Sequence, residues 1–164
     1  MVMNLKSLIE AMCYAAGHIS GTLYIDSNGE DYKLYVVYSC WNIKKECWYR
    51  EGLVYNKTNI WTSDDEWNNN WENIIARSIK WNPPTFWDGE VEAFLPRITN
   101  EFVKAKLASV EKDSDEFKWL FGTYVEDDFD DKYGEFEKFG NFRDEFWHET
   151  ARKFCDEHGI KYEE

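Results

Sequence analysis

The chain has 164 residues, and its 43% hydrophobic and 18% aromatic content excludes a disordered chain. Its formal net charge of −13 is uneven: residues 1–60 carry six basic and six acidic residues, whereas residues 61–164 carry 13 and 26. Such a field repels nucleic acid and anionic lipid and attracts basic partners, so we expect no direct contact with nucleic acid or membrane. The length predicts a single domain, 1–164, with a neutral part (1–60) and an acidic part (61–164).

The first segment, LKSLIEAMCYAAGH, predicts an amphipathic helix that is capped by Asn4 and ends at Gly17. It contains Glu10 and is too short to span a membrane, so we expect neither a membrane span nor an export signal. The cysteines match no zinc spacing, and without a signal peptide we expect reduced thiols and a cytoplasmic protein. The four are Cys13, Cys40, Cys47 and Cys155.

Residues 19–55 alternate in the way typical of β-strands. ISGTLYIDSNGEDYKLYVVYSCWN predicts two strands joined at Asn28-Gly29. A second hairpin follows, and a two-residue loop at 43–44 would place Cys40 opposite Cys47 across the ladder. The pair could bridge in an oxidising compartment, but two small buried hydrophobes are the favoured interpretation. The segment therefore predicts an antiparallel meander of at least three strands.

The period becomes helical after residue 62. Ser63 and Glu66 fit a capping box, which precedes an apolar stripe that the sequence NPP ends. The stripe comprises Trp67, Trp71, Ile74, Ile75 and Ile79.

Further caps divide the acidic part into helices. Asp88 is placed to begin one helix, with a kink or a short break at Pro96. Asp113 and Glu116 fit the cap of the next, which Gly122 would end. Together these patterns predict an α+β fold: an N-terminal helix and an antiparallel β-meander of three or more strands, followed by several helices packed on the sheet.

The stretch VEDDFDDKYGEFEKFG, residues 125–140, combines rings and acids. Thr123 and Glu126 fit a capping box, and at 100° per residue the four apolar positions of the stretch share a narrow arc. We therefore expect a helix up to Gly140, with its rings inward and its acids outward, before a last helix from Asn141 to Gly159. The inward set is Val125, Phe129, Tyr133 and Phe136; the outward set is Asp127, Asp128, Asp130, Asp131, Glu135 and Glu137.

Catalytic and metal motifs are weak. A calcium loop with Gly134 at its sixth position fails, because Phe129 would stand at the first ligand position and Gly140 at the twelfth. The short H-x-S/T motifs at His18 and His148 are interpreted as surface or capping histidines. A Cys13 nucleophile with His18 as base lacks an orienting group. We therefore expect no cofactor and no metal, and an enzyme is less expected than a binding protein.

The acidic face has two interpretations, a solvated surface and a binding surface. The charge exceeds the magnitude of roughly 2–8 that solubility requires, which favours binding. Rows such as Asp127, Asp131 and Glu135 on successive helical turns would lie about 5–6 Å apart, comparable with the spacing of phosphates along DNA. We therefore expect an inhibitor of a basic partner, most plausibly a nuclease, of the toxin-immunity or phage anti-restriction or anti-CRISPR type.

The expected partner-binding residues are six acids and two tryptophans as apolar anchors. They are Asp127, Asp128, Asp130, Asp131, Glu135, Glu137, Trp119 and Trp147. Two alternatives stay open: a small hydrolase or transferase with a site near Cys13 and His18, and a structural subunit of an oligomer.

Overall fold

The computed structural model describes residues 1–55, 61–63 and 65–164. The chain forms two compact units. The sheet unit comprises Met1–Pro84 and Trp147–Glu164, and the helical unit comprises Thr85–Phe146. Two compact units can still unfold together as one cooperative domain. The single domain over residues 1–164 therefore stays a prediction.

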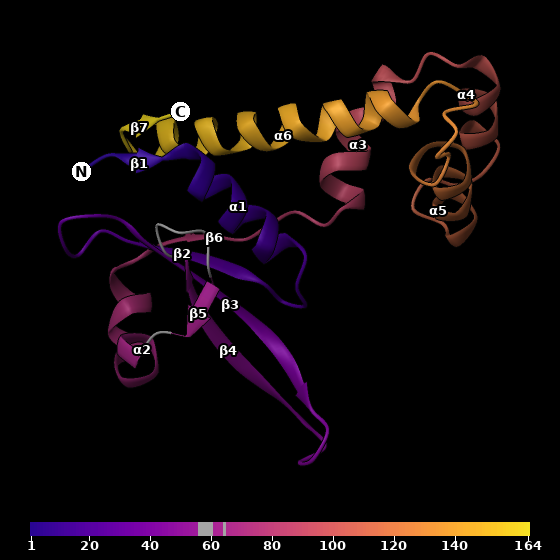
Figure 1. Cartoon of the computed structure of the whole chain (residues 1–164). Coiled ribbons are helices and arrows are strands. Elements are labelled where there is room, and N and C mark those ends of the chain that lie inside the picture. Colours follow the sequence, from indigo (N-terminus) through magenta and orange to yellow (C-terminus); the bar gives the residue numbers. More distant parts are fainter. Residues whose placement is uncertain (56–60, 64) are drawn as a thin grey trace. The chain divides into compact units, whose positions relative to one another are not determined.

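The sheet unit is built on one antiparallel sheet with the strand order β5-β4-β3-β2-β6 (Figure 1). Together with the helices that cover it, this sheet confirms the predicted α+β fold with its N-terminal helix and meander. Its strands are β2 (Thr22–Asp26), β3 (Lys33–Asn42), β4 (Cys47–Tyr55), β5 (Trp61–Ser63) and β6 (Ile79–Trp81).

Helices cover both faces of this sheet. Helix α1 (Leu5–Ala16) begins at Asn4, whose side chain accepts a hydrogen bond from the Ser7 N–H at 2.9 Å, and it packs on β2 and β3. Gly21 allows this close packing, because a Cβ there would lie 1.9 Å from the Ala15 carbonyl oxygen. Helix α2 (Asp65–Arg77) contacts β2 and β4 and contributes Ile74 to a core with Tyr24, Tyr35 and Val37.

The second hairpin has a longer turn than the sequence predicted. Residues 43–46 form the turn, so Cys40 pairs with Tyr49, and Cys47 pairs with Asn42. The Asn42 side chain accepts from the Lys45 N–H at 3.0 Å, and Glu46 adopts a left-handed conformation with φ 48°, which together favour four residues over two. The prediction that Cys40 faces Cys47 is therefore wrong, and none of the four cysteines forms a disulfide.

Two boundaries of the sheet unit also differ from the prediction. Helix α2 ends at Arg77, and Ile79 begins β6, which pairs with β2. Ile79 thus belongs to a strand and not to the helical stripe. The predicted Ser63–Glu66 capping box lies outside the described side chains.

The helical unit encloses its own core, which includes Phe94, Phe121 and Phe139. Its first helical segment starts at Thr85, which caps the Asp88 N–H at 3.0 Å, and it breaks after Arg97, where Ile98 is extended. The elements are η1 (Trp87–Val91), α3 (Glu92–Phe94), η2 (Leu95–Arg97), α4 (Glu101–Ala108), α5 (Asp115–Phe121) and η3 (Gly122–Glu126).

One cap of the helical unit differs from the sequence prediction. Ser114, rather than Asp113, caps α5 by accepting from the Phe117 N–H at 3.1 Å, while Asp113 adopts φ 68°. At its other end α5 stops at Phe121 with Gly122 as its C-cap residue, as predicted, and the chain continues directly into the π-helical turn η3.

Helix α6 (Phe136–Glu157) begins in the helical unit and ends in the sheet unit. It runs through Gly140 without a break, so the separate helix predicted from Asn141 does not exist. Its end is confirmed at Gly159, with φ 65°. Beyond it, β7 (Tyr162–Glu163) pairs in parallel with β1 (Met3–Asn4). Within the described ranges, no helix combines the length and apolar character that crossing a membrane requires.

Candidate functional site

The acidic loop, residues 127–135, replaces the middle of the predicted helix, between η3 and α6. Asp131 and Gly134 adopt left-handed conformations, with φ 51° and 77°. The Asp128 and Asp131 carboxylates accept hydrogen bonds from the N–H groups of Tyr133 and Phe136, both at 3.0 Å. Aspartate side chains that bond to nearby backbone compete with helix formation, so the predicted helix over 123–140 is wrong.

This loop inverts the predicted inside and outside at two positions. Phe129, expected inward, is 75% exposed, and its ring contacts the ring of Phe136 at 5.7 Å. Glu135, expected outward, is 1% exposed. Val125 and Tyr133 do turn inward: Val125 is buried, and Tyr133 stacks on Phe102.

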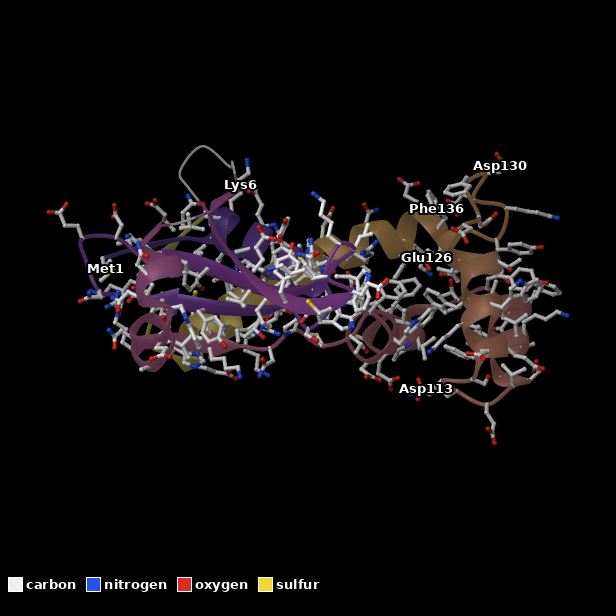
Figure 2. All side chains as sticks on the ribbon, turned by 90° about the horizontal axis from the view of Figure 1, so that it is seen from below. Met1, Lys6, Asp113, Glu126, Asp130 and Phe136 are labelled. Atoms are coloured by element: carbon white, nitrogen blue, oxygen red, sulfur yellow. The ribbon has the colours of Figure 1, made fainter. Side chains whose placement is uncertain are left out.

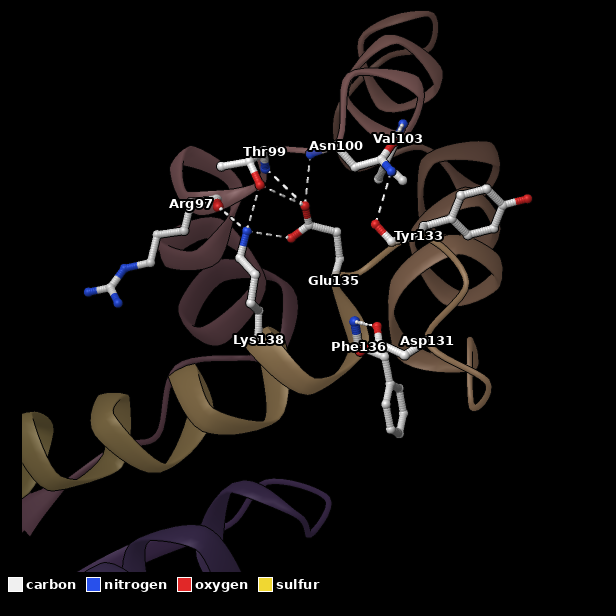
Figure 3. Close-up of polar contacts among 9 residues, drawn as sticks. All are labelled: Arg97, Thr99, Asn100, Val103, Asp131, Tyr133, Glu135, Phe136 and Lys138. Atoms are coloured by element: carbon white, nitrogen blue, oxygen red, sulfur yellow. Dashed lines mark hydrogen bonds and ion pairs between the residues drawn. The ribbon is translucent and has the colours of Figure 1, made fainter.

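Glu135 is buried because it ties the loop to the start of α4 (Figure 3). Its Oε1 accepts from the N–H groups of Thr99 and Asn100, both at 2.9 Å, and its Oε2 lies 3.0 Å from Lys138 Nζ. Burial alone would raise the pKa of Glu135, but the hydrogen bonds from Asn100, Lys138 and Thr99 lower that pKa below its ordinary value. Glu135 is therefore a structural carboxylate and not part of an outward face.

Asn100 completes the same junction (Figure 3). Its Nδ2 donates to the Tyr133 carbonyl at 2.9 Å, and its Oδ1 caps α4 by accepting from the Val103 N–H at 3.0 Å. These bonds and those of its own aspartates tie the acidic loop to the start of α4 and to its own backbone.

Three acids in and beside the loop remain for a partner. Asp127, Asp130 and Glu137 are exposed and have no cation partner within the part of the chain that the structure describes. The two nearby lysines are used elsewhere: Lys138 by Glu135, and Lys132 over the Tyr133 ring at 5.4 Å. Asp128 and Asp131 are half-buried and hold the loop, so they contribute negative charge from a fixed position.

The charge is dense enough to affect a neighbouring carboxyl. Burial, followed by the carboxylate of Asp127, raises the pKa of Glu126 above its ordinary value. This carboxyl is the last residue of η3 and adjoins the loop.

The two predicted tryptophan anchors differ. Trp119, on α5, is 65% exposed. Trp147 is 8% exposed and packs edge-on against Trp81 at 6.2 Å, so its predicted role as an exposed anchor is wrong. Phe129 is an exposed ring of the loop that the sequence interpretation placed inward, because its spacing matched an apolar helix face.

The acids of the helical unit do not form one row. Asp113, beside α5, and Asp130, in the loop, lie at opposite ends of the unit (Figure 2). Asp127, Asp131 and Glu135 do not occupy successive turns of a helix, because the chain is a loop there. The phosphate-spacing argument therefore fails, although 17 acidic against eight basic residues leave this unit a net charge of −9.

At the alternative site near Cys13 and His18, the histidine caps a helix. His18 Nδ1 lies 2.7 Å from the Tyr14 carbonyl oxygen, at the end of α1, and its ring stacks on Tyr14 and lies 4.5 Å from the Tyr38 ring. This geometry is that of a capping histidine. Nearby, burial raises the pKa of the Cys40 thiol, so it stays protonated and is no activated nucleophile.

Among the residues that the structure describes, no group of three or more His, Cys, Asp or Glu side chains is arranged to hold a metal ion. Comparison with protein-family models, curated proteins and solved structures yields no match for this chain.

Proposed function

We propose that this chain is a cytoplasmic protein-binding inhibitor that uses the acidic loop to bind and block a basic protein. The observation that carries the proposal is Phe129, a large ring held 75% exposed between Asp127, Asp128, Asp130 and Asp131. Exposed aromatic side chains surrounded by polar groups are typical anchors of protein interfaces. Four cysteines without a disulfide are compatible with a reducing compartment.

The partner's chemistry follows from the charges that the loop leaves unpaired. Asp127 and Asp130 would face lysine or arginine side chains, and Phe129 would enter an apolar depression between them. Complementary charge accelerates association, and the buried ring slows dissociation. A nuclease is the partner class we propose, since a groove that holds nucleic acid offers a basic surface.

A fixed loop favours this use. Asp128 and Asp131 hold the backbone on either side of Phe129, so binding loses little additional conformational entropy. Because the Phe129 ring is exposed, the fold forgoes the stabilisation that burying this ring would give. A role of the ring in binding would explain its exposure.

The test is capture from a lysate of the native host, with salt elution and identification of the retained proteins. The variant changes Asp127→Lys, Phe129→Ser and Asp130→Lys and leaves Asp128 and Asp131 in place, because they hold the loop. We expect the wild type to retain a basic protein, a nuclease on our proposal, that the variant does not retain.

A matched control carries the same number of charge reversals in the sheet unit instead of the acidic loop. Glu30→Lys and Glu163→Lys change exposed residues of the sheet unit. The control should retain the partner, whereas equal loss in both variants would assign capture to net charge alone. Full retention by the folded loop variant would refute the proposal.

A further inference from the structure

A second surface of the helical unit combines an apolar hollow with free carboxylates. An open hollow of about 530 Å³ lies on α5 and is lined by Asp115, Glu116, Trp119 and Leu120. Trp119, one of the lining residues, is 65% exposed, which is unusual for so large an apolar side chain. The hollow thus has an aromatic wall and an acidic rim.

The rim is not neutralised from within the chain. Asp115 and Glu116 are exposed and have no cation partner within the described ranges. Both lysines of the segment are used elsewhere: Lys112 pairs with Glu92, and Lys118 Nζ lies over the Trp87 ring at 5.6 Å. A ligand must therefore supply its own cations to satisfy the rim.

We infer that this hollow binds a cationic amphipathic segment of a partner protein, with an apolar side chain against Trp119 and lysine or arginine side chains on Asp115 and Glu116. A purely ionic ligand would leave the apolar wall exposed to water, so it fits the hollow poorly. An uncharged or acidic ligand would leave the carboxylates of the rim without cations, so it is disfavoured as well. The inference deepens the proposed function and rests on it, because the segment would belong to the same basic partner.

The hollow and the acidic loop are formed by different residues: four side chains of α5 line the hollow, and residues 127–135 form the loop. Asp113, which precedes α5, and Asp130, in the loop, lie at opposite ends of the helical unit in Figure 2. A partner that engaged both would bind through two spaced anchors, and each could be removed without the other.

The test uses three short synthetic peptides with the full chain. The first contains lysine and leucine at helical spacing, the second replaces leucine with serine, and the third replaces lysine with glutamate. The readout is the Trp119 indole N–H peak in a ¹⁵N–¹H correlation spectrum, assigned by its loss in Trp119→Phe. We expect the lysine–leucine peptide to shift this peak and to bind about tenfold more tightly than either control peptide.

Variants then locate the site. Two variants should each weaken the binding of the lysine–leucine peptide about tenfold: the single variant Trp119→Ala, and the double variant Asp115→Asn with Glu116→Gln. Trp71→Ala removes another exposed tryptophan, 47% exposed, from α2 in the sheet unit and should leave binding unchanged. A static Trp119 peak, equal binding of the serine or glutamate peptide, or full binding by Trp119→Ala would overturn the inference.

The loop variant separates this inference from the proposed function. Asp127→Lys with Phe129→Ser and Asp130→Lys should abolish capture of the protein partner but leave the peptide at the hollow. If the loop variant still captures the partner while Trp119→Ala loses the peptide, the proposed function fails and the hollow stands. If the loop variant fails in capture and Trp119→Ala binds the peptide fully, the hollow fails and the proposed function stands.

Discussion

Two regions of the helical unit, only a few residues apart in sequence, use carboxylates in opposite ways. At the α4 junction, Glu135 is buried and meets two backbone N–H groups and Lys138. At the exposed part of the acidic loop, Asp127 and Asp130 meet no cation among the described residues. The difference teaches that the neighbours of an acid decide its role: where donors converge the carboxylate holds the fold, and where none lies nearby it is available to a partner.

The largest expected effect is on the buried side of this comparison. Glu135→Ala should lower the free energy of unfolding by about 3 kcal/mol, because it leaves two N–H groups without an acceptor and Lys138 without its counterion. Urea unfolding followed by circular dichroism measures this loss. The exposed neighbour variant Glu137→Ala should change stability by less than about 0.5 kcal/mol. Equal effects at the two positions would contradict the comparison.

A buried acid of the sheet unit extends the same reasoning. Asp26 is 2% exposed, and its carboxylate lies 2.8 Å from Arg77 and also accepts from the Asn28 N–H. Asp26→Asn should cost about 2 kcal/mol of unfolding free energy, since it removes the ion pair but keeps the shape. Urea unfolding checks this value, and Glu30→Gln, in the exposed loop after β2, serves as the control. An unchanged midpoint for Asp26→Asn would show that the pair does not stabilise the unit.

Acidification should remove the stabilisation that the Glu135 and Asp26 carboxylates provide. Burial would raise the pKa of Asp26, but the hydrogen bonds from Arg77 and Asn28 lower it below 3.8, and the pKa of Glu135 is likewise lowered below 4.5. Carboxyls with a lowered folded-state pKa stabilise the protein above their ordinary pKa, and that stability is lost as the pH falls through the folded-state pKa. The urea concentration at the unfolding midpoint should therefore decrease as the pH is lowered below about 4.5. Glu135→Gln should show a smaller fall than wild type, and parallel curves would contradict the assignment.

The smallest expected effect on stability belongs to Phe129. Phe129→Ser should change the free energy of unfolding by less than about 0.5 kcal/mol, because the ring is exposed. An inward ring of the predicted helix would instead cost about 3–5 kcal/mol on truncation. A thermal melt distinguishes these two losses of stability. A large decrease in the melting temperature would show that the Phe129 ring is packed in the core rather than exposed to solvent.

Sequence patterns predicted the sheet better than the acidic loop, for physical reasons. Alternation and the Asn28-Gly29 signal locate the strands of the first hairpin, because burial of β2 and β3 specifies their register. The four-residue turn before Cys47 escaped prediction, because it depends on one Asn42 hydrogen bond.

The helical prediction for 123–140 failed because ring spacing is a weak constraint where aspartates can bond to their own backbone. Asp128, Asp131 and Gly134 together contain that signal in the sequence. The two backbone N–H groups that Glu135 accepts from, however, lie 36 and 35 residues away in the chain. Long-range partners of this kind cannot be read from local spacing. For the same reason, exposure of Trp119 and burial of Trp147 were not distinguishable in advance.

The most direct measurement of the central claim is the association rate of the captured, purified basic partner with wild type and loop variant as the sodium chloride concentration rises. The account predicts a wild-type rate that falls by about tenfold between low and physiological salt, and a slower, less salt-sensitive rate when Asp127→Lys, Phe129→Ser and Asp130→Lys are combined. The Glu30→Lys, Glu163→Lys control should keep most of the wild-type rate. A rate that is independent of salt and equal in wild type and loop variant would contradict the claim that the acidic loop binds the partner.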